Sequence, residues 1–272
     1  RSRLMEGEQT PCEFRTAADM TMWPIEIAQA EYIDGRGELV AAGVTGQTQA
    51  RAAIRLRLRR SDGSDIAELG LDRLSLFLSP GAGNSWQLLE ALCTQVAGLA
   101  GRSTDRRADW VQHLPDGGIE HRGFGPDEAL LPTPRRVFDG YRLLQEYFAM
   151  PERFLFVDLH GLQPVIKRAT GSDVDVYILL NESRRELAPV VVPDAFTLNA
   201  VAAVNLFPKR CDRVQISSRD TEQHVVPNRT AGLDFEIYAL ENVTGISGEG
   251  ADDVVFRPFY SATDFTAAGE TH

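Results

Sequence analysis

The residues best suited by type to acid–base chemistry are Asp158 and His160, two positions apart in an aromatic-rich stretch. On a β-strand, side chains two positions apart share one face and lie about 6.6 Å apart along the chain. Such a carboxylate can orient an imidazole as a general base if a nucleophile lies near. The chain has no G-x-S-x-G motif, because the nearest match, residues 83–87, lacks the second glycine. We therefore expect no catalytic residue and a hydrogen-bonded pair at the end of a strand.

Two acidic pairs have side chains that bind divalent cations in other proteins. Asp173 and Asp175 form one pair, and Asp252 and Asp253 form the other. Each lacks the run of oxygen ligands and the glycine of an EF-hand loop, so a turn or a strand edge is the expected role. His113 and His121 stand eight positions apart without an HExxH pattern. The sequence therefore predicts no metal site and no cofactor site.

The composition excludes several classes of function. The 272 residues include 28 Lys and Arg against 39 Asp and Glu, a formal net charge of −11. This charge repels phosphate backbones and anionic lipid, so we expect neither nucleic-acid binding nor membrane insertion. No P-loop motif is present, and the three cysteines are far apart in sequence, which favours a reducing compartment. The first residues show no signal-peptide core, and we expect the full protein to extend beyond both ends.

The clearest alternation of apolar and polar residues runs through 53–59. Ile54, Leu56 and Leu58 fall on one face of the predicted strand, and arginines fall on the other. An arginine row of this kind is able to grip an acidic partner, while a solvated sheet face is the more ordinary alternative. The candidate interface residues are Arg55, Arg57 and Arg59 in this row, and Arg210, Arg213, Arg219 and Arg229 near the other end of the chain.

The periodicity changes in the middle of the chain. Apolar residues at helical spacing predict a helix near 84–100, and residues 102–134 are predicted to form a long connection rich in Gly and Pro. Asp139 is placed to cap a short helix that Pro151 ends, and an aromatic strand with two apolar faces, 154–159, follows. The predicted core residues of this region are Tyr141, Leu144, Tyr147, Phe148, Phe154 and Phe156.

The second half of the chain is dominated by short β-like segments. These are 175–180, 204–208, 213–216, 223–226 and 234–240, whereas Phe196–Ala203 fits either a helix or an extended chain. The sequence predicts an α+β fold that is mainly β, with two sandwich-like, mostly antiparallel units and a few short helices. We expect the first unit to span residues 1–134 and the second to span residues 135–272.

Six sequence blocks resemble those of one protein family. They are Cys12–Thr16, Trp23–Ile25, Phe138–Phe148, Pro151–Leu159, Asn205–Lys209 and His224–Arg229. Their order and the run Gly-Tyr-Arg-Leu-Leu-Gln-Glu-Tyr-Phe are similar to TssF, also called VasA or ImpG, the baseplate protein of type VI secretion. The resemblance covers most of the chain, and the chain is similar to the middle of the family protein.

The resemblance implies a structural subunit of the bacterial baseplate wedge and no enzymatic activity. Its implied partners are a TssG-like wedge subunit, a TssK-like adaptor, the spike hub and the sheath, which together form a contractile injection machine. The implied location is the cytoplasm, with the baseplate docked near the inner membrane complex. The alternative is a β-sandwich hydrolase, or a module that binds a small ligand or carbohydrate, with Asp158, His160 and Asp175 as its site.

Overall fold

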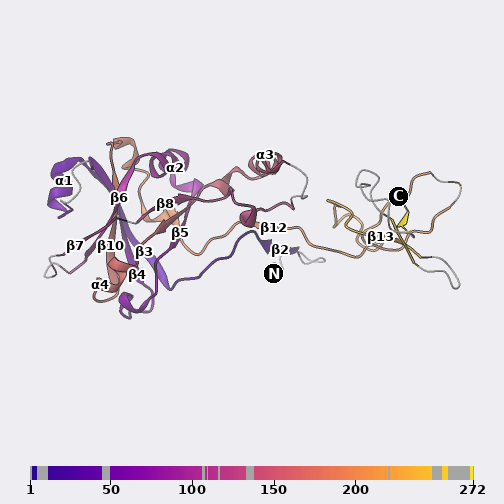
Figure 1. Ribbon diagram of the computed structural model, residues 1–272, viewed down its shortest axis with the longest axis horizontal. Coiled ribbons are helices and arrows are strands. Elements are labelled where there is room, and N and C mark those ends of the chain that lie inside the picture. The colour runs from indigo at the N-terminus through magenta and orange to yellow at the C-terminus, as the bar shows by residue number, and fades with distance from the viewer. Residues whose placement is uncertain are drawn as a thin grey trace. The chain divides into compact units, whose positions relative to one another are not determined.

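The computed structural model (Figure 1) describes residues 2–4, 12–44, 50–105, 108, 110–115, 117–132, 138–217, 219, 221–246, 253–256 and 270–271. The chain divides into two compact units. The larger unit spans residues 16–204, and the smaller unit consists of residues 1–15 and 205–272.

Two antiparallel sheets form the larger unit. The five-stranded sheet has the order β3 (Ile25–Asp34), β4 (Ala52–Arg60), β10 (Asp173–Leu180), β6 (Val96–Ser103) and β7 (Val111–Leu114). The four-stranded sheet has the order β11 (Phe196–Thr197), β5 (Leu74–Leu78), β9 (Phe156–His160) and β8 (Gly118–His121). Strand β12 (Ala203–Val204) ends the unit. These antiparallel sheets with short helices confirm the predicted α+β, mainly β class.

The strand pattern explains where the core lies. On β4, Ile54, Leu56 and Leu58 are fully buried, and the register places Leu56 opposite Val176 of β10. Inward side chains of the second sheet, such as Leu76 and Val157, belong to the same apolar cluster. Because alternate residues of a strand point to opposite faces, the same alternation leaves the arginines of β4 on the outer face.

The described residues contain four α-helices and six short 3₁₀ turns. Apolar residues of α2, such as Leu88, join the main core, whereas Leu39 of α1 packs in a second cluster on the other face of the five-stranded sheet. Figure 1 shows α3 projecting beyond the sheets. The elements are α1 (Gly35–Ala41), α2 (Ser85–Thr94), α3 (Asp139–Ala149), α4 (Gln163–Arg168), η1 (Ile66–Glu68), η2 (Pro80–Ala82), η3 (Pro126–Glu128), η4 (Pro151–Phe154), η5 (Arg185–Leu187) and η6 (Pro193–Ala195).

Two predictions for the middle of the chain need correction. The helix predicted near 84–100 ends at Thr94, and Val96 begins β6 instead of continuing the helical stripe. The predicted connection of residues 102–134 contains two strands, β7 and β8, and the turn η3. These strands are only four residues long, too short for period-two alternation to reveal them in the sequence.

The predicted boundary near residue 134 lies inside the larger unit. Strand β9 pairs with β5, and β10 inserts between β4 and β6, so strands from both halves of the sequence share each sheet. The ambiguous stretch 196–203 is extended rather than helical, with β11 at its start. Asn199, with a positive φ of 54°, interrupts it.

The smaller unit contains few strands. β1 (Ser2–Leu4) pairs with β2 (Cys12–Thr16), and a second sheet joins β13 (Val243–Gly245), β14 (Val254–Phe256) and β15 (Glu270–Thr271). Of the strand predicted at 204–208, only Val204 lies in a strand, β12, and the strands predicted at 213–216, 223–226 and 234–240 are not formed, since no described residue from 205 to 242 lies in a regular strand. Pro208 and Pro227, which lack an N–H donor, interrupt this region.

Candidate functional site

Asp158, the proposed acid of the sequence, lies on β9 and is fully buried. The antiparallel register places Ser75 of β5 directly opposite, and the Ser75 hydroxyl donates to Oδ1 at 2.5 Å. Arg122 donates to Oδ2 at 2.8 Å, and Arg73 donates to the same oxygen. The carboxylate therefore ties together residues that belong to or flank three adjacent strands.

The electrostatic environment keeps Asp158 ionised. Burial raises the pKa of its carboxyl, but the hydrogen bonds from Ser75 and Arg73 and the positive charges of Arg122 and Arg73 lower it more. The pKa of Asp158 consequently lies below its usual value. An ionised carboxylate with a lowered pKa accepts hydrogen bonds from the arginines and is too weak a base for acid–base catalysis at neutral pH.

His160 does not complete a catalytic pair with Asp158. The imidazole lies against β8, where a Cβ at Gly118 would stand only 2.9 Å from Nε2 of His160. In the described part of the chain, the carboxylate of Asp158 accepts from Ser75, Arg73 and Arg122 and not from this imidazole. The expected hydrogen bond between Asp158 and His160 is therefore not formed, because the arginines occupy the carboxylate.

Asp173 and Asp175 each form a bidentate pair with an arginine of the adjacent strand. Arg57 donates to both oxygens of Asp175, at 2.7 and 2.9 Å, and Arg59 donates to both oxygens of Asp173, at 3.0 Å each. The bond to Asp175 raises the pKa of Arg57, and the bond from Arg59 lowers the pKa of Asp173. Within the described ranges, no three His, Cys, Asp or Glu side chains are grouped to hold a metal. Asp252 lies outside those ranges.

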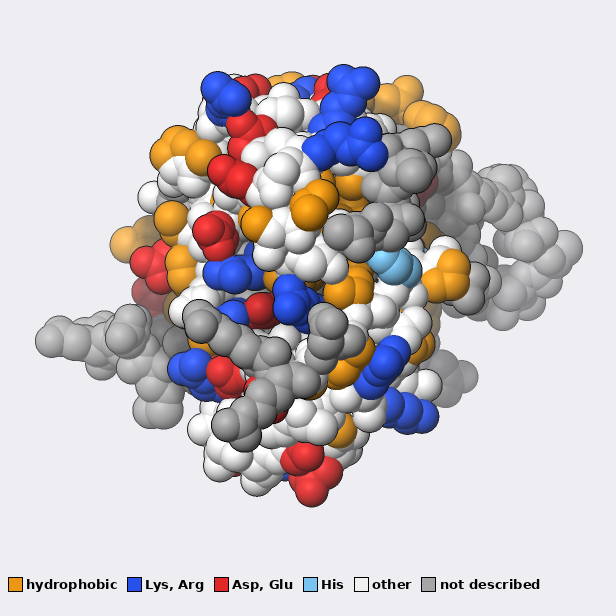
Figure 2. Space-filling view, turned by 90° about the vertical axis from the view of Figure 1, so that its left-hand side faces the viewer, with side chains coloured by type: hydrophobic (Ala, Val, Ile, Leu, Met, Phe, Trp, Pro, Cys, Tyr) orange, Lys and Arg blue, Asp and Glu red, His pale blue; other side chains and the backbone are white. Residues whose placement is uncertain are grey.

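The arginine row of β4 forms ion pairs within its own sheet. Besides the pairs of Arg57 and Arg59 with β10, Arg55 contacts Glu31 of β3 at 2.6 Å. Figure 2 views the structure from the left-hand side of Figure 1 and shows basic and acidic side chains next to one another rather than separated by sign. A partner that used these arginines would have to displace acids already in place.

His121 and His113 lie on β8 and β7, and the second arginine group lies in the smaller unit. A ring nitrogen of His121 lies 2.7 Å from the carbonyl oxygen of Phe154, and His113 belongs to β7. In the smaller unit, all four candidate arginines are exposed. Among them, the guanidinium of Arg229 donates to the carbonyl oxygen of Arg213 at 3.0 Å.

The sequence assigned the wrong face of α3 to the core. Tyr141, Leu144, Tyr147 and Phe148 do share one side of the helix, but that side faces solvent, and Phe148 is 81% exposed. Their interpretation as core residues is wrong, because charged residues occupy the buried side of the helix. Phe154, by contrast, is 5% exposed, and Phe156 is half-buried.

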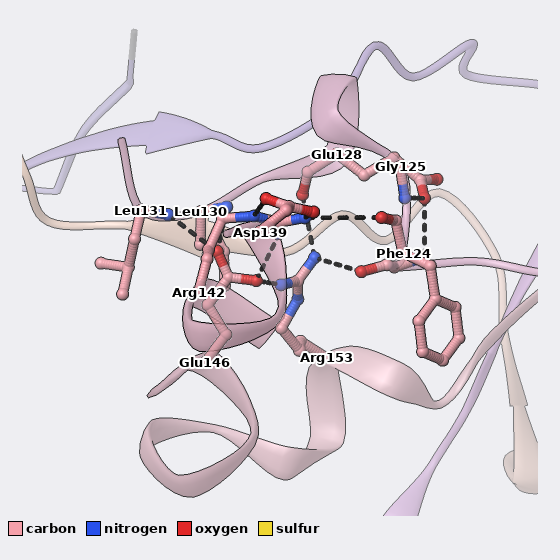
Figure 3. A network of polar contacts seen from close by, with 10 residues as sticks. Phe124, Gly125, Glu128, Leu130, Leu131, Asp139, Arg142, Glu146 and Arg153 are labelled. Atoms are coloured by element: carbon pink, nitrogen blue, oxygen red, sulfur yellow. Dashed lines mark hydrogen bonds and ion pairs between the residues drawn. The ribbon is translucent and has the colours of Figure 1, made fainter. Parts of the chain in front are cut away.

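The buried side of α3 carries a cluster of charged side chains (Figure 3) that the sequence pattern did not predict. Glu146 accepts the backbone N–H groups of Leu130 and Leu131, both at 3.0 Å, through Oε1. Its Oε2 accepts from Arg142 at 3.0 Å and forms an ion pair with Arg153. Arg142, Glu146 and Arg153, called here the buried triad, are all nearly inaccessible to solvent.

The two arginines of the triad have further hydrogen-bond partners outside it. Asp139 accepts two bonds from Arg142, at 2.7 and 2.8 Å, and Arg153 donates to the carbonyl oxygens of Gly123 and Glu128, both at 2.9 Å. Burial, followed by the positive charge of Arg142, lowers the pKa of Arg153 to about 10, so the guanidinium remains charged at neutral pH. The i,i+4 spacing of Arg142 and Glu146 is the sequence signal from which this ion pair could have been predicted.

The larger unit contains a hollow that can be compared with the alternative site of Asp158, His160 and Asp175. Its lining includes Asp158, Arg122, Glu128 and Arg153 beside residues 17–20 and 200–202, but neither His160 nor Asp175. Asp158 stands on the four-stranded sheet, whereas Asp175 stands on the five-stranded one. The three groups of the alternative site are therefore not brought together. Among the described residues, no helix is long and apolar enough to cross a bilayer.

Comparison with known proteins agrees in sequence and in fold. Residues 1–272 match the family model described as "Type VI secretion system, TssF". The type VI secretion system component TssF1 of Pseudomonas aeruginosa is 38% identical over 264 residues, which cover 97% of this chain and 42% of that protein. A chain in the cryo-electron microscopy structure of the TssK-TssF-TssG baseplate subcomplex aligns with a TM-score of 0.67 and 28% identity, covering 93% of this chain and 44% of that one. The chain thus spans less than half the length of both relatives.

Proposed function

Because this chain belongs to the TssF family of the type VI secretion system, we propose that it is part of a structural subunit of the secretion baseplate. The observation that carries the proposal is the fold match over 93% of the chain to a protein solved within a baseplate subcomplex. A subunit of this kind works by holding its neighbours in fixed positions rather than by turning over a substrate.

The polar groups of the larger unit support a structural role. Asp158 binds flanking arginines, Asp173 and Asp175 bind Arg59 and Arg57, and the buried triad holds α3 in place. Of these groups, Asp158, Asp175 and the triad are buried, and we propose that their pairing fixes the arrangement of the elements that carry them. Acid–base chemistry would instead need a base whose pKa lies near neutral pH, whereas the pKa of Asp158, which accepts the hydroxyl of Ser75, lies below its usual value.

We further propose the partners of this subunit. The structural relative was solved together with TssK and TssG, so a TssG-like wedge subunit and a TssK-like adaptor are the proposed direct partners. The spike hub and the sheath follow as partners reached through the assembled wedge. The proposed location is the cytoplasm, with the baseplate docked near the inner membrane complex.

The two arginine groups differ as interface candidates. Arg55, Arg57 and Arg59 already have acidic partners on neighbouring strands, so they offer less to a protein partner. Arg210, Arg213, Arg219 and Arg229 are exposed. We propose this second group as the contact residues, since arginine is enriched at protein interfaces.

Co-expression tests the proposed function. The full-length protein should co-purify with TssG-like and TssK-like subunits from the same genome and elute with them in size-exclusion chromatography. The double variant Arg210→Glu/Arg213→Glu should weaken that complex, whereas Arg185→Glu, an 87% exposed side chain on the larger unit, serves as the matched control. A wild-type protein that elutes alone, or one that hydrolyses a substrate in isolation, would contradict the proposal.

A further inference from the structure

The outward face of α3 is an apolar surface whose side chains are exposed. Its side chains are Tyr141, Leu144, Tyr147 and Phe148, called here the α3 stripe, and Phe138 precedes them. The rings pack on one another, with centroids 5.9 Å apart for Phe138 and Tyr141 and 5.6 Å apart for Tyr147 and Phe148. Contiguous exposed apolar side chains of this size mark interaction sites.

The α3 stripe is held outward by the buried triad on the opposite side of the helix. Figure 3 shows Arg142 and Glu146 pointing from α3 toward Arg153 and toward the loop that carries Leu130. Turning the apolar side inward would break these ion pairs and free the backbone N–H groups of Leu130 and Leu131. Because the helix cannot roll without that loss, the surface is preformed for a partner.

The spacing of the stripe fits another helix. Tyr141, Leu144 and Phe148 stand at positions i, i+3 and i+7, and the outer two lie about 10 Å apart along the axis. Side chains at this spacing form a ridge that packs into the groove between rows of a second helix. A helix that binds such a ridge must itself present an apolar face.

The charges on and around α3 indicate which kind of partner the α3 stripe can bind. The charged residues of α3 are Asp139, Arg142 and Glu146, and all three are tied to one another. The stripe itself therefore offers no cation to a lipid headgroup and no ion pair to a charged peptide. The whole chain carries a formal charge of −11, so a second copy would be repelled, whereas a neutral or basic protein would not.

We propose that the α3 stripe is the docking surface for an amphipathic helix of a different, non-acidic protein subunit. This inference rests on the proposed function, in which the chain is assembled with other subunits, and it adds the surface and the chemistry of one contact. The contact is apolar and uncharged at its centre, and the buried triad positions it without taking part in it.

The test uses the full-length protein co-expressed with its TssG-like and TssK-like subunits. The variant Leu144→Ser/Phe148→Ser should reduce co-purification of one subunit at least tenfold, with an unchanged melting temperature because both side chains are exposed. The matched control is Val40→Ser on α1, since Val40 is 62% exposed and Leu144 is 56% exposed. The control should co-purify both subunits as the wild type does.

Each other outcome contradicts the inference in a recognisable way. Co-purification of both subunits at the wild-type level by the double variant would overturn the docking surface and leave the proposed function intact. A variant that loses only self-association, measured by light scattering, would assign the stripe to a second copy. A variant that loses only binding to anionic vesicles would assign it to a membrane. A wild type that binds neither subunit would refute the proposed function and this inference with it.

Discussion

Arg142 and Glu146 stand one turn apart on α3 and form an ion pair with a nitrogen–oxygen distance of 3.0 Å, although both side chains are almost fully buried. Two charges removed from water lose their hydration, and only close, well-satisfied partners compensate for that loss. Here Asp139, Arg153 and two backbone N–H groups supply the partners. The helix is therefore attached through its polar side, which is the reverse of a common amphipathic helix.

Removing one member of the buried triad should destabilise the protein strongly. Glu146→Gln leaves the buried Arg153 without its carboxylate partner and leaves Arg142 with Asp139 alone, and we expect a loss of about 3–5 kcal/mol in the free energy of unfolding. Urea unfolding followed by circular dichroism measures this loss. The control is Arg185→Ala, which breaks an exposed ion pair with Asp34 and should change little. Equal effects of the two variants would show that the triad adds no stability.

Two aromatic residues of the same region should respond differently to truncation. Phe154→Ala removes a buried ring and should cost about 3–5 kcal/mol, because a cavity remains in the core. Tyr141→Ala removes a ring that is 63% exposed and should change the free energy of unfolding by about 0.5 kcal/mol or less. Paired thermal melts distinguish the two positions. A large loss in Tyr141→Ala would place that ring in a core after all.

Alternation predicted the strand around β4 and its buried face, because a strand with one wet face must show period two. The helix at 139–149 was predicted with its apolar side correctly grouped, yet the sequence could not indicate which side is buried. That choice depends on Leu130 and Leu131, whose N–H groups bind Glu146 from another segment of the chain. Periodicity is a local property, whereas the partner of a buried charge comes from tertiary structure.

The candidate site shows the same limit. Asp158 and His160 were paired because they are two positions apart, but Arg73 and Arg122, both distant in sequence, occupy the carboxylate. The division of the chain could not be found either, since β10 inserts between β4 and β6 from far along the sequence. The sequence shows the type of each residue, but it does not show which residues lie beside it in the folded chain.

The ion pairs across β4 and β10 should couple in proportion to their burial. A double-mutant cycle with Arg57→Ala and Asp175→Ala should give a coupling energy of about 0.5–1.5 kcal/mol, because the bond is bidentate and Asp175 is nearly buried. The same cycle on Arg59 and Asp173, where the arginine is more exposed, should give a smaller value. Denaturant midpoints of the single and double variants supply both numbers. A larger coupling for the exposed pair would contradict burial as the deciding factor.

Acid should remove the stabilisation that Asp158 provides. Its pKa is lower in the folded state than the value of about 3.9 expected in the unfolded chain. A lowered pKa contributes stability that is fully present above the unfolded value and is lost as the pH falls through the folded value, because the unfolded state takes up the proton first. The wild type should therefore be more stable than Asp158→Asn by a constant margin between pH 5 and 7, and this margin should shrink below about pH 4. Melting temperatures of both proteins across this range measure the margin, and a margin that does not change with pH would show that the charge of Asp158 contributes nothing beyond its hydrogen bonds.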